Sequence, residues 1–170
     1  GPSLKPGTTA GAGYCDVRRL REMIVWKQVG VVSLWRYTEN DRNYPGWHLN
    51  SDSTGCESLL ALVDELDRNP GSHRTVQLVS PSQAQLAVPN NKNGRAAWLA
   101  PAKLKLTRST ENEAWSFPPD HNPASLTFGS RWMENLREGI AGISKGRGDF
   151  SIGNAGPGSL PLWFWWSGAA

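Results

Sequence analysis

Short apolar stretches separated by turn residues follow one another along most of the chain after residue 30. Many of them are rich in β-branched and aromatic residues, and several alternate apolar with polar positions, which is typical of strands. Pro, Gly and Asn stand between them and favour turns. The segments predicted as strands are residues 31–38, 47–49, 74–80, 85–88, 102–108, 113–117, 125–128, 150–152 and 160–166.

Two longer segments have apolar residues at helical spacing. Ser53 or Thr54 can cap the first helix, which ends before residues 69–71, and Ser130 can cap the second. The expected apolar stripes are Leu59, Leu60, Val63 and Leu66 in the first helix, and Met133, Leu136, Ile140 and Ile143 in the second. Residues 16–28 could form a further helix, although 24–26 also suits a strand.

The pattern predicts one α+β domain over residues 16–170 with a tryptophan-rich core. We expect a mostly antiparallel sheet of about five to eight strands, arranged as a meander, with two main helices packed on one face. Residues 1–15 are rich in Gly, Pro, Thr and Ala and are predicted to form a flexible tail, part of which resembles a tag remnant.

Composition argues against several classes of protein. The net charge is only +3, and the densest basic cluster, Arg18, Arg19 and Arg21, is typical of a solvated helix face, so nucleic-acid binding is not expected. The apolar stretches are far shorter than the roughly 20 residues that cross a bilayer. The three histidines, which lack a metal-ligand spacing, are His48, His73 and His121. We therefore predict no metal and no cofactor.

Catalytic motifs are also missing from the sequence. There is no G-x-S-x-G pentapeptide, and the Gly-rich strings after residue 145 lack the lysine of a phosphate loop. Cys56 stands at a predicted helix N-terminus, where a thiol can become nucleophilic, but a small buried side chain is the favoured interpretation. We predict a non-enzymatic protein in which Cys15 and Cys56 are free thiols of a reducing cytoplasm; a single disulfide between them is the alternative.

The loop between the first two predicted strands is the first candidate binding surface. It carries the residue types that dominate protein-binding hot spots. These partner-binding candidates are Arg36, Tyr37, Asp41, Arg42, Tyr44 and Trp47. The alternative is a hairpin loop with an internal Asp41–Arg42 pair and with Trp47 turned inward.

Nine tryptophans are the second unusual feature. In the C-terminal strand Leu162, Phe164 and Trp166 are expected on one face, and Trp163 and Trp165 on the other. If nothing covers the second face, its indoles form a patch suited to a protein partner, a sugar ring or a stacked base. If loops or the tail fold over it, the tryptophans are core. Asp149, between a glycine and Phe150, either caps a turn or contacts a partner.

Two stretches resemble segments of small bacterial proteins, among them immunity proteins that neutralise toxins used in competition between bacteria. They are residues 34–38 leading to 45–47, and residues 148–153 leading to 162–166. The resemblance covers about a fifth of the chain and its motifs are structural. It implies a cytoplasmic, non-enzymatic protein that blocks a toxin by binding it, and it assigns no residue to that contact.

Three hypotheses follow from the sequence. The first is a toxin-binding protein that uses the loop at 37–47, or the acidic helix residues between Glu57 and Asp67 if the toxin is a basic nuclease. The second is a carbohydrate- or small-ligand-binding domain, or an enzyme, that uses Trp163 and Trp165 as a stacking platform. The third is a homodimer formed through the same aromatic strand.

Overall fold

A computed structural model of the chain describes residues 26–148, 150–154 and 158–166, and it shows an α+β fold, as predicted. The strands are β1 (Val32–Tyr37), β2 (Trp47–Ser51), β3 (His73–Gln77), β4 (Trp98–Leu99), β5 (Lys103–Arg108), β6 (Trp115–Ser116), β7 (Ala124–Phe128), β8 (Phe150–Ile152) and β9 (Leu162–Phe164). The helices are α2 (Ser53–Arg68), α3 (Gln83–Ala87) and α4 (Met133–Ser144), with a 3-10 turn η1 (Ser130–Trp132) before α4.

The described strands form two sheets rather than the one that we expected. Their orders are β4-β1-β2-β9-β8 and β3-β5-β7-β6. Most pairings are antiparallel, as predicted, but β2 pairs with β9 and β5 pairs with β7 in parallel. The expected simple meander is therefore wrong, because β9 returns to lie between β2 and β8 in the first sheet, and β7 lies between β5 and β6 in the second.

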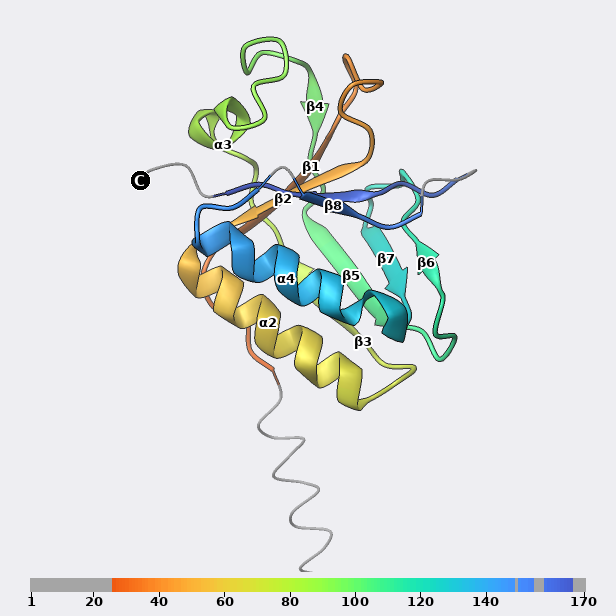
Figure 1. Cartoon of the computed structure of the whole chain (residues 1–170). Coiled ribbons are helices and arrows are strands. Elements are labelled where there is room, and N and C mark those ends of the chain that lie inside the picture. The colour runs from red at the N-terminus through yellow and green to blue at the C-terminus, as the bar shows by residue number, and fades with distance from the viewer. Residues whose placement is uncertain (1–25, 149, 155–157, 167–170) are drawn as a thin grey trace, which may run out of the picture.

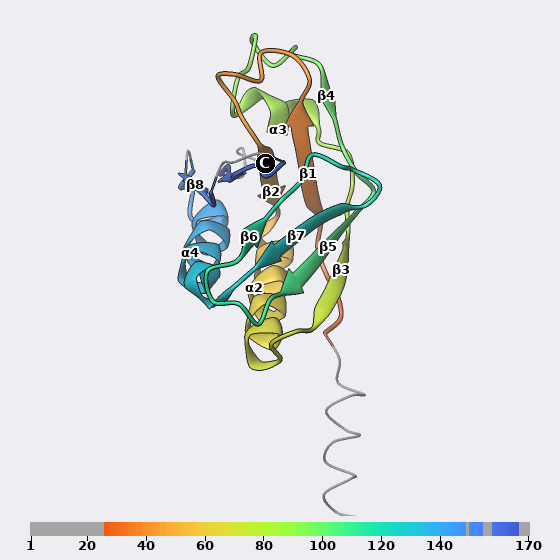
Figure 2. The ribbon, with the colours of Figure 1, turned by 90° about the vertical axis from the view of Figure 1, so that its right-hand side faces the viewer.

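The two sheets are joined by the short segment between β4 and β5. The segment from β4 to β5 leaves β1 after Leu99 and pairs with β3 from Lys103 onward. The amide of Val79, just beyond β3, then donates to the carbonyl of Val32 in β1 at 2.9 Å. These contacts join the two sheets, and Figure 2 shows the strands β5, β6 and β7 of the second sheet in front of α2, with α4 to their left.

One predicted strand, residues 85–88, is wrong, because residues 83–87 form the short helix α3. The side chain of Ser82 accepts a hydrogen bond from the amide of Gln85, and the Gln85 side chain accepts one from the amide of Ser82. This reciprocal capping box satisfies two amides at the helix start and favours a helix despite the apolar residues that follow.

The two long helices occupy the predicted segments and lie side by side (Figure 1). The cap of α2 is Asp52 instead of Ser53 or Thr54, because the Asp52 carboxylate accepts from the amides of both Gly55 and Val31. Every residue of the two predicted stripes is buried except Leu60, which is half-buried. None of the helices in the described ranges is long and apolar enough to span a membrane.

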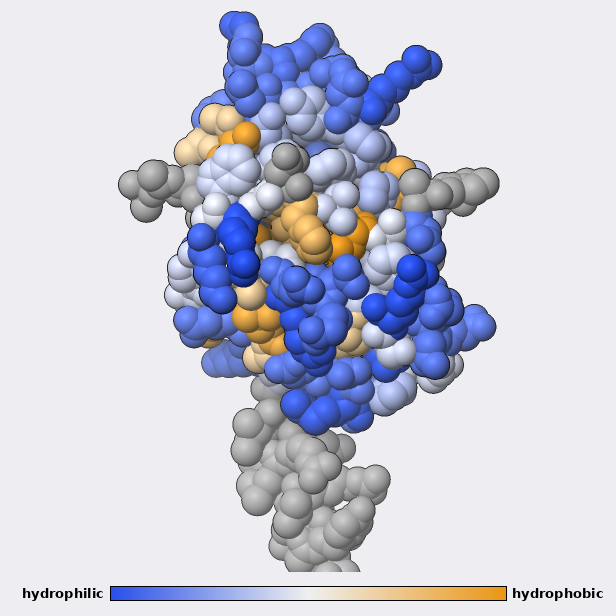
Figure 3. Space-filling model, in the orientation of Figure 1, coloured by the Kyte–Doolittle hydropathy of each residue, from blue (hydrophilic) through white to orange (hydrophobic). Residues whose placement is uncertain are grey.

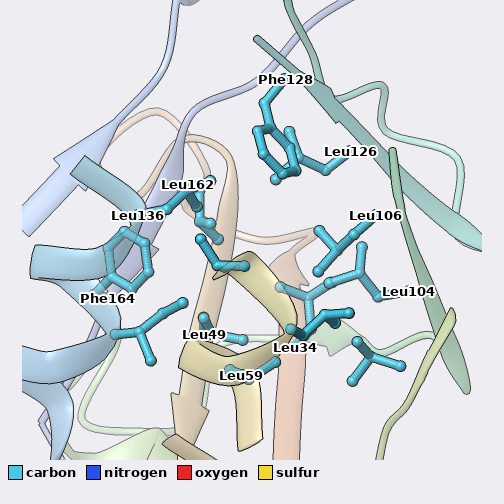
Figure 4. Packing of buried hydrophobic residues seen from close by; sticks show 14 of the residues in the cluster. Leu34, Leu49, Leu59, Leu104, Leu106, Leu126, Phe128, Leu136, Leu162 and Phe164 are labelled. Carbon is cyan, nitrogen blue, oxygen red and sulfur yellow. The ribbon is translucent and has the colours of Figure 1, made fainter. Parts of the chain in front are cut away.

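The main core lies between the two helices and both sheets (Figure 4). Alternate residues of the central strands supply it, for example Leu34 of β1, Leu49 of β2 and Phe164 of β9. The intervening residues of β1 and β2 are also buried, on the opposite face of the sheet, whereas Trp163 of β9 is half-buried.

The predicted tail and residues 16–25, including the Arg18 to Arg21 cluster and Cys15, lie outside the described ranges. Residues 26–28, the end of the possible helix, are not helical. Gln28 instead bonds the backbone of β3, since its amide nitrogen donates to the carbonyl of Gln77 and its amide oxygen accepts from the Gln77 amide, both at 2.8 Å.

Helix α4 offers a test of this packing through its two buried glycines. A Cβ at Gly139 would lie 2.4 Å from the ring of Phe164, whereas a Cβ at Gly142 would lie 3.4 Å from its nearest neighbour, in Arg147. We expect Gly139→Ala to lower the free energy of unfolding by about 1–3 kcal/mol through overpacking. Gly142→Ala should raise it by about 1 kcal/mol through helix propensity. Urea denaturation of both variants checks this, and equal effects would contradict the packing.

Candidate functional site

A second, smaller hydrophobic cluster covers the face of the five-stranded sheet that points away from α2 and α4. Its buried members are Trp35, Tyr37, Leu86, Ala96 and Trp165. Tyr44, Trp98, Trp163 and Trp166 pack against them as partly buried neighbours. This aromatic cluster supports two loops that project from the end of the sheet, at the top of Figure 1.

His48 of β2 lies at the centre of the aromatic cluster and is fully buried. Its ring stacks on Trp35 and Trp165, with centroid distances of 5.8 and 5.9 Å. Its Nδ1 accepts a hydrogen bond from the indole N–H of Trp165 at 2.8 Å, and its Nε2–H donates to the carbonyl of Tyr44 at 3.2 Å. Both ring nitrogens are thus satisfied by the neutral imidazole, and burial lowers the pKa of His48 to about 4.

The two loops above the cluster, residues 38–46 and 89–97, are hydrogen-bonded to each other, and we call them the paired loops. Buried Asn91 joins them: its side-chain oxygen accepts from Asn40 at 2.8 Å, and its amide nitrogen donates to the carbonyl of Glu39 at 3.3 Å. The Glu39 carboxylate pairs with Lys92 at 2.9 Å and accepts from the amide of Ala97. These two interactions hold the pKa of Glu39 below its usual value.

The paired loops also hold an unusual backbone. Non-glycine residues with positive φ in the described part of the chain occur only here, at Asn40, Asn90, Lys92 and Asn93, with φ between 52° and 60°. Asparagine tolerates this left-handed region, but lysine is less suited to it. Such conformations persist only where surrounding contacts enforce them, and they are concentrated at functional sites.

The structure separates the candidates of the first predicted surface into buried and exposed residues. Tyr37 and Trp47 are buried, and Trp47 stacks on Phe117 with a centroid distance of 5.4 Å. Arg36 is half-buried over the Trp47 ring and donates from Nε to the carbonyl of Pro119. The alternation of β1 and β2 turns Tyr37 and Trp47 onto packed faces and leaves them little surface for a partner, whereas Arg36 stays partly accessible.

The remaining candidates of that surface do lie in the paired loops. Asp41 and Arg42 are exposed, and they form no ion pair with each other. Tyr44 is half-buried and donates its hydroxyl hydrogen to the carbonyl of Pro89 at 3.2 Å, so that it fastens one loop to the other. Accessible charge therefore remains at the tip of the loop.

The second predicted surface, the exposed pair of indoles, is not formed. Trp165 is buried with 5% of its surface exposed, and Trp163 is half-buried. The Trp163 indole stacks on Trp165 and donates its N–H to the carbonyl of Pro45 at 2.7 Å. Trp165 is thus a core residue, as in the alternative interpretation, whereas Trp163 keeps part of its surface accessible. Asp149 lies outside the described residues, so its role stays a prediction.

The acidic residues of α2 are engaged in ion pairs with arginines of other elements. Arg137 of α4 contacts Asp64 and Asp67, and the largely buried Arg108 of β5 also contacts Asp67. Glu65 pairs with Arg74 at 3.0 Å. These pairs connect α2 to α4 and to the second sheet, and they leave less free negative charge for a basic partner.

Chemistry elsewhere in the described residues is sparse. Cys56 is a buried free thiol whose pKa is raised by burial, which disfavours the nucleophilic thiolate. No group of three or more His, Cys, Asp or Glu side chains in the described ranges could hold a metal ion. The paired loops are therefore the strongest candidate site.

The sequence predicts only one of the paired loops, residues 38–46, as a binding surface. The sequence predicts only a turn for the Pro-, Asn- and Gly-rich segment after residue 88, although residues 90–95 supply Asn91, Lys92 and the exposed Arg95. Its run of asparagines ending in glycine is the sequence signal for consecutive left-handed residues. What the sequence could not show is that this turn meets the loop at 38–46, about 50 residues earlier.

Comparison of the chain with protein-family models, with curated proteins and with solved structures gave no significant match. The function must therefore be argued from the geometry of the paired loops and of the cluster beneath them.

The burial of His48 predicts a specific loss of stability in acid. Its pKa is 6.5 when unfolded and about 4 when folded, so the unfolded state binds the proton first as the pH falls. The contribution of neutral His48 to the free energy of unfolding is complete above pH 6.5, and it falls by about 3 kcal/mol between pH 6.5 and 4. Denaturant titrations across this range should show that slope, and His48→Gln should remove it. Parallel slopes in both proteins would refute this role of His48.

Asn91 provides a test of the joint between the loops. We expect Asn91→Ala to lower the free energy of unfolding by about 2 kcal/mol, because it removes two hydrogen bonds and leaves the carbonyl of Glu39 and the Asn40 amide without them. Asn43→Ala is the matched control, since Asn43 donates only one exposed hydrogen bond, to Asn40. Asn43→Ala should change the free energy of unfolding by less than about 0.5 kcal/mol. Similar losses in the two variants would show that Asn91 does not join the loops.

Proposed function

We propose that this chain is a non-enzymatic binding protein that holds another protein through the paired loops. We further propose that the partner is a toxin that the chain neutralises, as in the immunity proteins that parts of the sequence resemble. The proposed place of action is the cytoplasm, where a free thiol such as Cys56 is usual.

The observation that carries the proposal is the rigid shape of the paired loops. Left-handed residues cost roughly 1–3 kcal/mol each, and here the buried Asn91 and the aromatic cluster enforce four of them at the surface. The main core does not require this arrangement, because it lies on the other face of the sheet. A loop that is held in one conformation before binding loses little entropy on association, which favours a tight complex.

The charges of the paired loops support a partner with an acidic surface. Arg42 and Arg95 are exposed and form no ion pair with the described residues, whereas Lys92 is neutralised by Glu39. Asp41 is the one exposed acid in the loops without such a partner in the described ranges. Arginine is enriched at binding hot spots because its planar guanidinium forms paired hydrogen bonds with carboxylates.

This choice replaces two other surfaces considered from the sequence. The acidic face of α2 is less suited to a basic partner because Asp64, Glu65 and Asp67 already contact arginines. A sugar-stacking platform is less suited because Trp165 is buried beneath the paired loops.

Co-expression of the chain with each protein encoded by the neighbouring genes tests the proposal. We expect one of these proteins to be toxic alone, to be tolerated with the chain, and to co-purify with it as a stable complex. Absence of both protection and a complex for every neighbour would refute the immunity function.

Charge reversal in the paired loops tests the surface itself. Arg42→Glu combined with Arg95→Glu should weaken the complex by about 2–4 kcal/mol, roughly 30- to 1000-fold in Kd, and abolish protection. Lys103→Glu is the matched control, since Lys103 is an exposed cation of β5 in the other sheet. Titration calorimetry of the three proteins gives the comparison. A complex that tolerates the double variant as well as the control must use another surface.

A further inference from the structure

A second surface, separate from the paired loops, lies on the other side of the five-stranded sheet, where strand β8 passes over α4. Figure 3 shows apolar side chains gathered in the middle of this face and surrounded by hydrophilic residues. Phe150 of β8 is one of the few large apolar side chains that are exposed in the described ranges, with 36% of its surface accessible. An exposed apolar patch with a polar border is typical of an interaction site.

A cavity of about 200 Å³ opens beside Phe150. Its walls come from α4, from the turn that follows it, and from the two last strands of the sheet. The lining residues are Glu138, Gly139, Gly142, Arg147, Gly148, Phe150 and Phe164. The volume is below the range of about 300–1,000 Å³ that is usual for small-molecule sites, and it suits one large side chain.

Gly142 keeps this cavity open although the packing of the fold does not require a glycine there. At Gly139 a Cβ would collide with Phe164 at 2.4 Å, but at Gly142 the nearest atom, the Cβ of Arg147, lies at 3.4 Å. A glycine inside a helix costs about 1 kcal/mol relative to alanine. The space beside Gly142 is therefore maintained at a cost to stability, which is expected of a pocket that something fills.

Strand β8, beside the cavity, has one edge that pairs with no other described strand. Two backbone hydrogen bonds connect β2 to the chain around β9: the Trp47 amide donates to the Pro161 carbonyl, and the Trp165 amide donates to the Leu49 carbonyl. The odd-numbered residues around β9 therefore direct their N–H and C=O groups toward β2. Even-numbered residues of β9 therefore point toward β8, where Phe150 faces Phe164 and Ile152 faces Leu162. Because the pattern alternates, Ser151 directs its N–H and C=O away from β9. Strand β8 is the last in its sheet, so these groups face outward.

From these observations we propose that an extended segment of a partner protein pairs with the edge of β8 and inserts one large apolar side chain into the cavity. In β-strand addition the main chain supplies hydrogen bonds, and pockets for alternate side chains supply specificity. Phe150 and Phe164 lie on the cavity side of the strands with their ring centroids 5.9 Å apart, so they form the apolar floor for that side chain.

The charges of the described residues around the cavity indicate which residue of the partner should stand beside its large apolar side chain. Arg147 lines the cavity and the nearby Lys145 is exposed, and neither forms an ion pair within the described ranges. Glu138, at the α4 wall, is the one acid among the described residues of the lining. The partner segment that fits is therefore an extended peptide with a large apolar residue and an acidic residue beside it, directed at Arg147.

A library of random dodecapeptides, displayed and selected on the full chain, tests this proposal. We expect enrichment of sequences that pair one large apolar residue with an acidic residue. The affinity of the most enriched peptide, measured by fluorescence anisotropy, should fall roughly tenfold or more in Gly142→Leu, which fills the cavity, and several-fold in Arg147→Ala. Ser144→Leu adds the same side chain at an exposed position of α4 and should leave affinity unchanged.

Two further measurements isolate the strand pairing. Ser151→Pro removes the outward N–H, and N-methylation of the peptide backbone removes hydrogen-bond donors without changing the protein; each should weaken binding about tenfold or more. The variant of the paired loops, with Arg42 and Arg95 reversed, should bind the peptide normally, so this inference can fail or succeed apart from the proposed function. A library with no enriched sequence, or enriched peptides that bind Gly142→Leu and wild type equally, overturns it.

Discussion

Strand β2 lies at the centre of the five-stranded sheet, and both of its faces are buried. Leu49 points into the main core beneath the helices, whereas His48 and Asn50 point into the aromatic cluster on the opposite face. A strand buried on both faces can carry polar side chains only if their hydrogen bonds are satisfied. His48 meets this condition through Trp165 and Tyr44, and Asn50 donates to the carbonyls of Trp165 and Trp166.

These buried polar contacts connect parts of the chain that are far apart in sequence. Asn50 accepts a hydrogen bond from Gln85 at 2.9 Å, and the same Gln85 side chain caps α3. Helix α3 leads directly into the second of the paired loops, while Tyr44 and Pro45 of the first loop bond to His48 and Trp163. The shape of the paired loops is therefore fixed from below by the sheet as well as by their own contacts.

The sequence predicted what depends on local pattern and missed what depends on distant contacts. The apolar stripes of α2 and α4 follow from spacing alone. The apolar residues near Gln85 predict a strand, but Ser82 and Gln85 also have the spacing of a capping box, which is the local signal for the helix that forms. Whether Trp163 was exposed could not be read from the sequence, because its cover, the carbonyl of Pro45, lies 118 residues away.

Strand β9 brings the two proposed surfaces within one residue of each other. Phe164 forms the floor of the cavity at α4, and its neighbours Trp163 and Trp165 belong to the aromatic cluster beneath the paired loops. A substitution in β9 would disturb both surfaces and could not assign a function to either. Gly142 and Arg42 each belong to one surface alone, on opposite sides of the sheet, so effects of changing them should be additive unless the two partners are coupled. Departure from additivity would then measure how strongly the sheet transmits one binding event to the other.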